Sequence, residues 1–167
     1  QLKKSFFYQI STDEVFGSAS HNSYFDEKSP YSPNSPYSAS KAGADHFVKA
    51  FQKTFNLPTI ISYSSNNFGP YQNEEKFIPK IISCVKKNED IPIYSDGSNI
   101  RDWIYVEDHC KAIELILEIG KPGEEYCIGG SNEMSNLEIC KLILKIIDKL
   151  IPGKNKNANM DRIKFVK

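Results

Sequence analysis

The sequence of 167 residues lacks a glycine-rich phosphate-binding turn. Its nine glycines form neither G-x-G-x-x-G nor G-x-x-G-x-x-G, and only a few residues precede the first apolar run at 6–12. A complete dinucleotide-binding domain needs a strand, that turn and a helix. Such a complete domain is therefore excluded, and we expect the chain to be a fragment of a longer protein.

The chain also lacks an excess of either charge. Lys plus Arg and Asp plus Glu both total 21, so no general attraction to nucleic acid is expected. With 40% apolar and 25% charged residues, neither a membrane protein nor a disordered one is indicated. The opening residues 1–7 have neither the length nor the flanks of a secretory signal, so a cytoplasmic location is the default expectation.

Cysteine and histidine are few and show no metal-binding spacing. The four cysteines contain no Cys-x-x-Cys pair and lie in apolar helix or strand patterns, so we expect buried free thiols. His21, His46 and His109 stand apart from other possible ligands. We therefore expect no metal site.

What is present is an alternation of strand and helix patterns. Short apolar runs predict strands at residues 6–12, 58–64, 91–94, 125–128 and 162–166. Helical periodicity predicts helices at 37–55, 77–87, 106–118 and 135–150, and the last begins with a capping-box pattern. The prolines of residues 21–36 predict a loop, and Asp96-Gly97 a turn. We expect an α/β fold whose strand–helix–strand unit at 6–64 forms a parallel sheet.

Two clusters of proton-handling groups flank one short stretch of chain. Tyr37 and Lys41 are one helical turn apart, so the phenol and the ammonium share a face and the cation can stabilise a phenolate. Upstream, Thr12, Asp13 and Glu14 end an apolar run, where α/β folds place their chemistry. Adjacent carboxylates on an extended strand point to opposite faces, so both reach one ligand only if the strand ends there.

Five motifs resemble, in order and spacing, those of the dTDP-glucose 4,6-dehydratases, which are extended short-chain dehydrogenase/reductases. The motifs are STDEVFG at 11–17, PYSASKA at 36–42, SNNFGPY at 65–71, EKFIP at 75–79 and IRDWIYVEDH at 100–109. Phenylalanine at positions 16 and 68 replaces the family's common tyrosine, and the loop after Gly17 is short.

The resemblance implies an organisation in two parts. Residues 1–70 would be the C-terminal half of an NAD-binding Rossmann domain. Residues 71–167 would be mostly a truncated sugar-nucleotide-binding domain, interleaved with the end of the Rossmann sheet. The expected fold is thus a partial Rossmann-like parallel sheet with part of the smaller substrate-binding domain.

The resemblance also implies the chemistry, and the side chains suit it. Tyr37, its pKa lowered by Lys41 and a nicotinium ring, would take the proton of the sugar 4-hydroxyl while NAD accepts the C4 hydride. Glu14 would then remove the C5 proton, and Asp13 would protonate the departing 6-hydroxyl. Thr12 would hydrogen-bond the 4-oxygen, and hydride return to C6 would give a 4-keto-6-deoxy sugar.

Binding residues carry over in the same way. With Tyr37 and Lys41, Asn67 would contact the cofactor. The substrate-binding residues would be Thr12, Asn66, Lys76, Phe77, Pro92, Ile93, Tyr94, Arg101 and Asn136. Arg101 suits a pyrophosphate because its planar fork donates two parallel hydrogen bonds, although an ion pair with Asp102 is the alternative.

Three functions remain open at this stage. The first is a dehydratase, the second a related sugar-nucleotide epimerase or decarboxylase, and the third a noncatalytic sugar-nucleotide-binding or dimerising fragment. The acid–base pair Asp13-Glu14 favours the first, because elimination needs both groups. A homodimer is expected, with the helices that begin near Tyr37 and Phe77 against the partner copy, because the first of these carries more apolar surface than one buried face uses.

Overall fold

The computed structural model describes residues 5–19, 24–151 and 160–166, and it divides the chain into two units. Unit 1 comprises Gln1–Asn67 and Ile104–Gly130, and unit 2 comprises Phe68–Trp103 and Ser131–Lys167. The chain passes from one unit to the other at three points: within the short strand β3 (Asn66–Phe68), within the strand β5 (Ile100–Tyr105), and between Gly130 and Ser131. No helix in the described ranges is long and apolar enough to cross a bilayer.

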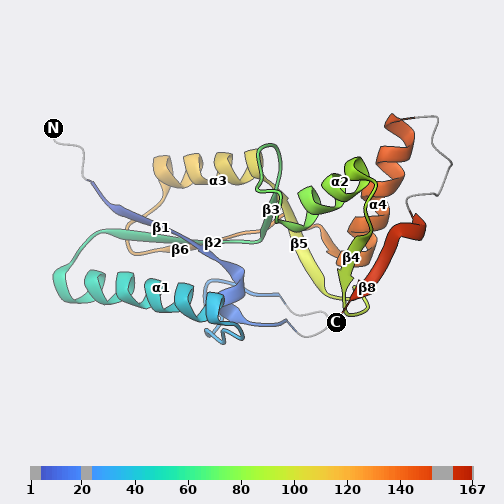
Figure 1. Cartoon of the computed structure of the whole chain (residues 1–167). Helices are drawn as coiled ribbons and strands as arrows, with labels where there is room; N and C mark the ends of the chain where they lie inside the picture. The colour runs from blue at the N-terminus through green and yellow to red at the C-terminus, as the bar shows by residue number, and fades with distance from the viewer. Residues whose placement is uncertain (1–4, 20–23, 152–159, 167) are drawn as a thin grey trace. The chain divides into compact units, whose positions relative to one another are not determined.

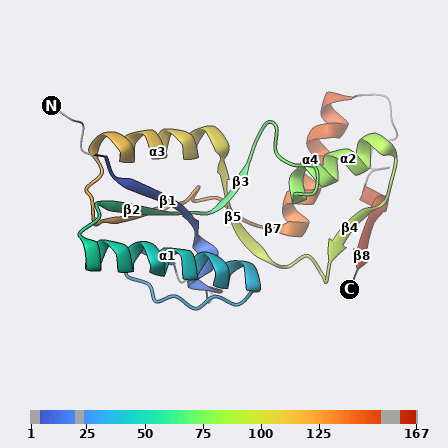
Figure 2. The same ribbon diagram turned by 60° about the vertical axis from the view of Figure 1, so that its left-hand side comes forward.

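Unit 1 is built on a parallel sheet with the order β1-β2-β6, formed by β1 (Phe7–Thr12), β2 (Thr59–Ser64) and β6 (Glu125–Ile128). Figures 1 and 2 show helices α1 (Pro36–Phe55) and α3 (Val106–Ile119) on opposite faces of this sheet. Every residue of the central strand β2 is consequently buried. The predicted α/β class and parallel pairing are confirmed.

Helix α1 begins where its sequence predicts. Ser35 is the N-cap, its hydroxyl accepts from the Ser38 amide at 3.1 Å, and Pro36 follows as the first helical residue. Its buried stripe consists of Ser38, Ala42 and Asp45, spaced as one face of a helix requires. This small, polar stripe lets the helix lie close to the sheet.

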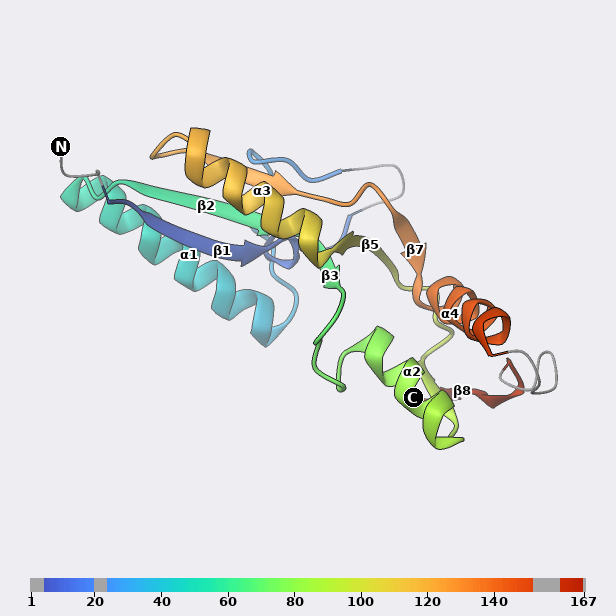
Figure 3. The ribbon, with the colours of Figure 1, turned by 90° about the horizontal axis from the view of Figure 1, so that it is seen from above.

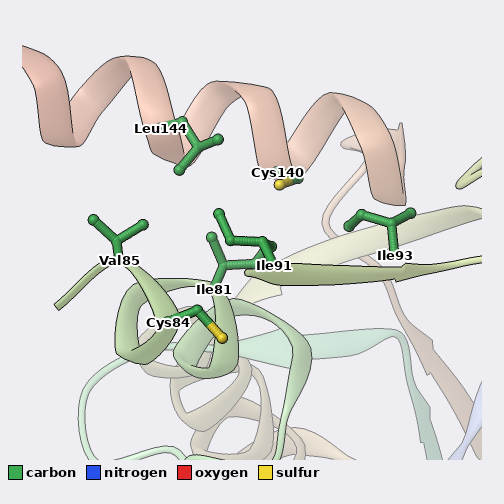
Figure 4. Packing of buried hydrophobic residues seen from close by; sticks show 7 residues of the cluster. All are labelled: Ile81, Cys84, Val85, Ile91, Ile93, Cys140 and Leu144. Atoms are coloured by element: carbon green, nitrogen blue, oxygen red, sulfur yellow. The ribbon is translucent and has the colours of Figure 1, made fainter. Parts of the chain in front are cut away.

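Unit 2 has its own apolar core, between helices α2 (Phe77–Lys87) and α4 (Asn136–Leu150) and the parallel pair β4 (Ile91–Tyr94) and β8 (Ile163–Val166). Figure 3 shows the two helices of this unit from above, and Figure 4 shows Leu144 and Cys140 of α4 facing the side chains of β4 and α2. The core residues are Ile81, Cys84, Val85, Ile91, Ile93, Cys140 and Leu144. The predicted capping box of α4 is confirmed, because Ser135 and Glu138 exchange hydrogen bonds.

Several elements of the structure were not predicted. Besides β3 and β5, they are β7 (Glu133–Ser135), which pairs antiparallel with β5, and two turns of 3-10 helix, η1 (Asp13–Phe16) and η2 (Met160–Arg162). The sheet that contains β7 has the order β3-β5-β7. Strands of three residues are too short to show a period, which explains why pattern analysis missed β3 and β7.

The expectation of four buried thiols is half wrong. Cys84 and Cys140 are buried in the core of unit 2, but Cys110 and Cys127 are exposed. An amphipathic helix such as α3 has a solvent face, and neighbouring residues of a strand point to opposite sides. An apolar neighbourhood in sequence therefore does not fix the side to which a thiol points.

Candidate active site

The first part of the site is the end of strand β1. Thr12 is both the last residue of the strand and the N-cap of η1, and its hydroxyl oxygen accepts from the Glu14 amide at 3.3 Å. The same hydroxyl donates to Oδ1 of Asp13 at 3.3 Å. Because the backbone turns directly after Thr12, Asp13 and Glu14 do not follow the alternation of an extended strand. The condition set by the sequence, a strand that ends here, is met.

A glycine closes this turn. Gly17 has a φ of 92°, and a Cβ at this position would lie 2.4 Å from the carbonyl oxygen of Ser32. The Ser32 amide in turn donates to the Val15 carbonyl at 2.9 Å. Any side chain at residue 17 would therefore force the turn η1, which contains Asp13 and Glu14, away from the segment at Ser32.

The second part of the site is the first turn of α1. Tyr37 is 57% exposed, so its hydroxyl is accessible to a ligand. Lys41, one turn later, donates from Nζ to the carbonyl oxygen of Ile10 at 2.8 Å. The lysine thus ties the start of α1 to β1, two residues before Thr12.

The electrostatics of Tyr37 correct one expectation. Partial burial, and then the nearby carboxylates of Glu14 and Asp13, raise the pKa of Tyr37 above its ordinary value. Lys41 and a nicotinium ring were expected to lower the pKa of this phenol; Lys41 is not among the causes of the shift, and its ammonium donates to the Ile10 carbonyl. Asp13 and Glu14 lie within electrostatic range of the Tyr37 hydroxyl. The structure therefore brings both predicted clusters into one place.

A buried carboxyl group that the sequence analysis missed anchors α1 against β1. Asp45 is fully buried; its Oδ2 accepts from the Ser11 hydroxyl at 2.5 Å and its Oδ1 accepts from the Gln9 amide at 3.2 Å. The Tyr31 hydroxyl also donates to Oδ2 at 3.4 Å. The helical spacing could have indicated that Asp45 is buried, because it continues the stripe of Ser38 and Ala42 on the helix face that packs against the sheet.

The network continues to the far edge of the sheet. Tyr31 and Tyr63 share a hydrogen bond of 2.5 Å, and Tyr63 donates to Glu125 at 2.6 Å. Glu125 also pairs with Lys49 at 2.8 Å. Burial is the largest cause that raises the pKa of both tyrosines, which keeps them protonated donors.

Asn66 and Asn67 follow strand β2. The Asn67 amide nitrogen donates to the Ser65 carbonyl at 3.0 Å and to the Ser64 hydroxyl at 3.3 Å, and its oxygen lies 2.7 Å from Nδ1 of His109. Sequence reasoning considered His109 only as a metal ligand. No group of side chains suited to a metal ion occurs in the part of the chain that the structure describes, and His21 lies outside it.

The remaining predicted binding residues belong to unit 2. Lys76 is exposed at the N-terminus of α2, and the ring of Phe77 lies 6.2 Å from that of the buried Trp103. On β4, Tyr94 is exposed and Pro92 is half-buried. Ile93 is only 1% exposed and belongs to the core, so any contact with a ligand would use its backbone.

Arg101 and Asn136 complete this set. Arg101 is exposed on β5, and the neighbouring Asp102 carboxylate accepts from the Asn132 amide at 2.7 Å. Asn136 is the first residue of α4, and its backbone N–H donates to the Asn99 backbone carbonyl at 3.0 Å. An exposed guanidinium beside a loop can bind a phosphate.

Comparison with known proteins identifies the family of the chain. The family described as GDP-mannose 4,6 dehydratase matches residues 1–166. A probable dTDP-glucose 4,6-dehydratase from Sinorhizobium fredii is 48% identical over 169 residues, which cover 100% of this chain and 48% of that relative. The chain therefore spans about half the length of the curated relatives it matches.

Solved structures give the same picture. The dTDP-glucose 4,6-dehydratase from Bacillus anthracis, in complex with NAD, matches with a TM-score of 0.87 and 44% identity, over 96% of this chain and 49% of that one. A UDP-glucuronic acid 4-epimerase from Bacillus cereus, in complex with UDP-glucuronic acid and NAD, also matches with a TM-score of 0.87. Its identity is 27%, and the match covers 99% of this chain and 50% of that one. The expected fold of an extended short-chain dehydrogenase/reductase is thus confirmed. Backbone similarity alone does not separate dehydratase from epimerase.

Proposed function

Because the chain belongs to the family described as GDP-mannose 4,6 dehydratase, we propose that the protein containing it is an NAD-dependent dTDP-glucose 4,6-dehydratase. This hydro-lyase converts dTDP-glucose to dTDP-4-keto-6-deoxyglucose. The observation that carries the proposal is that the first turn of α1, with Tyr37 and Lys41, is tied to the end of β1, which Asp13 and Glu14 follow: Lys41 donates to the Ile10 carbonyl at 2.8 Å, and both carboxylates contribute to the raised pKa of Tyr37. Only an elimination needs the phenol and both carboxyl groups, since an epimerase requires no acid for a departing hydroxyl.

Side chains of α1 and β3 fit the nicotinamide end of NAD. The exposed Tyr37 hydroxyl, the Lys41 ammonium and the Asn67 amide supply donors and an acceptor for a ribose and a carboxamide. When bound, NAD supplies the acceptor and later the donor of one hydride. We infer that unit 1 is part of the cofactor domain and unit 2 part of the sugar-nucleotide domain, as expected for residues 1–70 and 71–167.

The residues of the chain divide the proton transfers. Tyr37 takes the proton of the sugar 4-hydroxyl, and Thr12 hydrogen-bonds the 4-oxygen. The 4-ketone acidifies the C5 proton, which Glu14 removes, while Asp13 gives a proton to the departing 6-hydroxyl so that it leaves as water. For two adjacent carboxyl groups to take opposite roles, their surroundings must differ. The Thr12 hydroxyl donates to the Asp13 carboxyl group, whereas its bond to Glu14 involves the backbone amide, so the surroundings of the two carboxyl groups differ.

Residues of unit 2 bind the nucleotide end in this proposal. Arg101 meets the pyrophosphate as a bidentate donor. Pro92, Ile93 and Tyr94 border the base, with Ile93 contributing backbone, and Lys76 and Phe77 line the sugar-nucleotide site. Asn66 and Asn136 contribute amide groups. Supporting this assignment, the Arg101 and Tyr94 side chains are exposed.

We further propose a homodimer in which α1 packs against the partner copy together with α2. Phe47, Phe51 and Phe55 are 71%, 50% and 68% exposed and form one stripe at successive helical turns. Such a stripe supports an interface, because single helices rarely leave a row of aromatic rings in water. Light scattering of the complete protein should give twice the mass of one chain, and a monomer would contradict this assembly.

A cytoplasmic location is part of the proposal. Cys84, Cys110, Cys127 and Cys140 are all free thiols, as is usual in a reducing compartment.

The test of the function is turnover by the complete protein with dTDP-glucose and NAD. Mass spectrometry should detect a product that has lost one water, and Tyr37→Phe should lower the rate by at least about 100-fold, the contribution of a general base. Tyr24→Phe is the matched control, since Tyr24 is 81% exposed in the same unit and has no assigned role. Conversion of UDP-glucuronic acid to its 4-epimer, without loss of water from dTDP-glucose, would favour the epimerase instead.

A further inference from the structure

The orientation of the Asn67 amide is fixed by its neighbours. Its nitrogen is a donor only, and it faces two acceptors, the Ser65 carbonyl at 3.0 Å and the Ser64 hydroxyl at 3.3 Å. The amide oxygen therefore faces His109, whose Nδ1 lies 2.7 Å away. Reversing the amide would place its nitrogen against the imidazole and its oxygen against a carbonyl, which is unfavourable.

This orientation also fixes the tautomer of His109. Since the amide oxygen can only accept, Nδ1 of His109 must carry the hydrogen. The imidazole is in the first turn of α3 and is 8% exposed, and burial lowers its pKa, so the ring is neutral at pH 7. Nε2 is then the unprotonated nitrogen, and it has no hydrogen-bond partner among the described residues.

We propose that His109 is a positioning residue for cofactor binding, whose Nδ1–H holds the Asn67 oxygen where it accepts a hydrogen bond from the nicotinamide carboxamide. This rests on the proposed function, in which Asn67 contacts NAD. An amide oxygen has two lone pairs, so it can accept from His109 and from a ligand at once. The amide oxygen accepts hydrogen bonds, so the group that it binds must be a donor such as the N–H of a carboxamide.

The geometry explains why a histidine serves here. His109 and Asn67 are 42 residues apart in sequence, on α3 and on β3, so the bond joins a helix to the segment that follows β2. The Asn67 nitrogen donates to atoms of residues two and three positions before it. The imidazole ties the amide oxygen to another element of unit 1.

The first experiment uses three variants of the complete protein. His109→Leu removes the donor, His109→Asn places an amide N–H close to the position of Nδ1, and His109→Gln places it close to the position of Nε2. Calorimetric titration of NAD into cofactor-depleted protein should show binding about fivefold to tenfold weaker for the leucine and glutamine variants, the effect of one hydrogen bond. The asparagine variant should bind within about twofold of wild type. A merely space-filling role would instead favour leucine over the smaller asparagine.

The second experiment does not depend on a variant or on the function. Nitrogen-15 NMR of histidine-labelled wild type at pH 7 should give His109 a protonated Nδ1 and an unprotonated Nε2. An Nε2–H tautomer or a charged ring would overturn the proposal. If the leucine variant bound NAD as tightly as wild type does, only the role of His109 would be overturned. Failure of wild type to bind NAD would overturn the proposed function, and this inference with it.

Discussion

Replacing Asp45 by alanine should destabilise unit 1 strongly. Asp45 is fully buried and accepts hydrogen bonds from Ser11 and Gln9 on β1 and from Tyr31. Without the carboxyl group, the Ser11 hydroxyl, which is 4% exposed, has lost its acceptor, a penalty of about 1–3 kcal/mol. The bond from the half-buried Gln9 adds about 1 kcal/mol, and the long bond from Tyr31 adds little. We expect a total loss of about 3 kcal/mol.

Urea unfolding of the complete protein, followed by hydrogen exchange of the amides of α1 and β1, measures this loss. At a slope of about 2 kcal/mol per molar, the midpoint of unit 1 should fall by about 1.5 M. Asp45→Asn keeps the shape and one acceptor for Ser11, so it should cost about 1 kcal/mol. Asp108→Ala is the matched control, because it removes an exposed carboxylate of the same unit that is paired only with exposed Lys111, and such pairs contribute less than about 1 kcal/mol. Equal midpoints for Asp45→Ala and Asp108→Ala would refute the anchoring role.

Three further predictions concern the acid–base groups, pH and the cofactor. Glu14→Gln in the complete protein should leave proton removal by Tyr37 possible but block loss of water, so the absorbance of reduced nicotinamide should accumulate; turnover at the wild-type rate would show that Glu14 is not the base. Because the folded-state pKa of His109 is lowered, the unfolded state binds the proton more tightly, and stability should be full above about pH 6.5 and fall as pH falls through the lowered pKa. In urea unfolding, the His109→Leu variant should not show this loss of stability at low pH. If its unfolding free energy changed with pH as that of wild type does, the assignment would be contradicted. The 167-residue chain alone should bind NAD only at millimolar concentrations or weaker, because three hydrogen bonds of about 1 kcal/mol each do not offset an association cost of at least about 4 kcal/mol; micromolar binding by calorimetry would contradict this.

The sequence predicted the elements that have a clear period. The helix at 37–55, the strands that precede and follow it and the capping box of α4 were all confirmed, because each depends on local patterning and cap chemistry. Of the two strands, only β2 is buried throughout; in β1 only Ser11 is buried. Strand β5 was missed, since its burial does not alternate: Trp103 and Ile104 are both buried. Local propensity does not determine such a strand, whose two sides are covered by different neighbours.

The candidate site was predictable in its chemistry but not in its supporting contacts. Tyr37, Lys41, Asp13 and Glu14 stand in short motifs, so their residue types could be read directly. Ser11, a partner of Asp45, and His109, a partner of Asn67, lie 34 and 42 residues away in sequence, and only the fold brings each pair together. The direction of the Tyr37 pKa was not predicted, because its largest cause is partial burial, which the motif does not reveal.

The most direct test of the account follows one hydrogen atom through the reaction of the complete protein. With dTDP-glucose that carries deuterium at C4, proton removal by Tyr37 and Glu14 leaves the C4 hydrogen to move as a hydride and return to C6. The account predicts a 4-keto-6-deoxy product with deuterium in its C6 methyl group and a solvent hydrogen at C5. A product without deuterium at C6, or epimerised sugar that has lost no water, would contradict it.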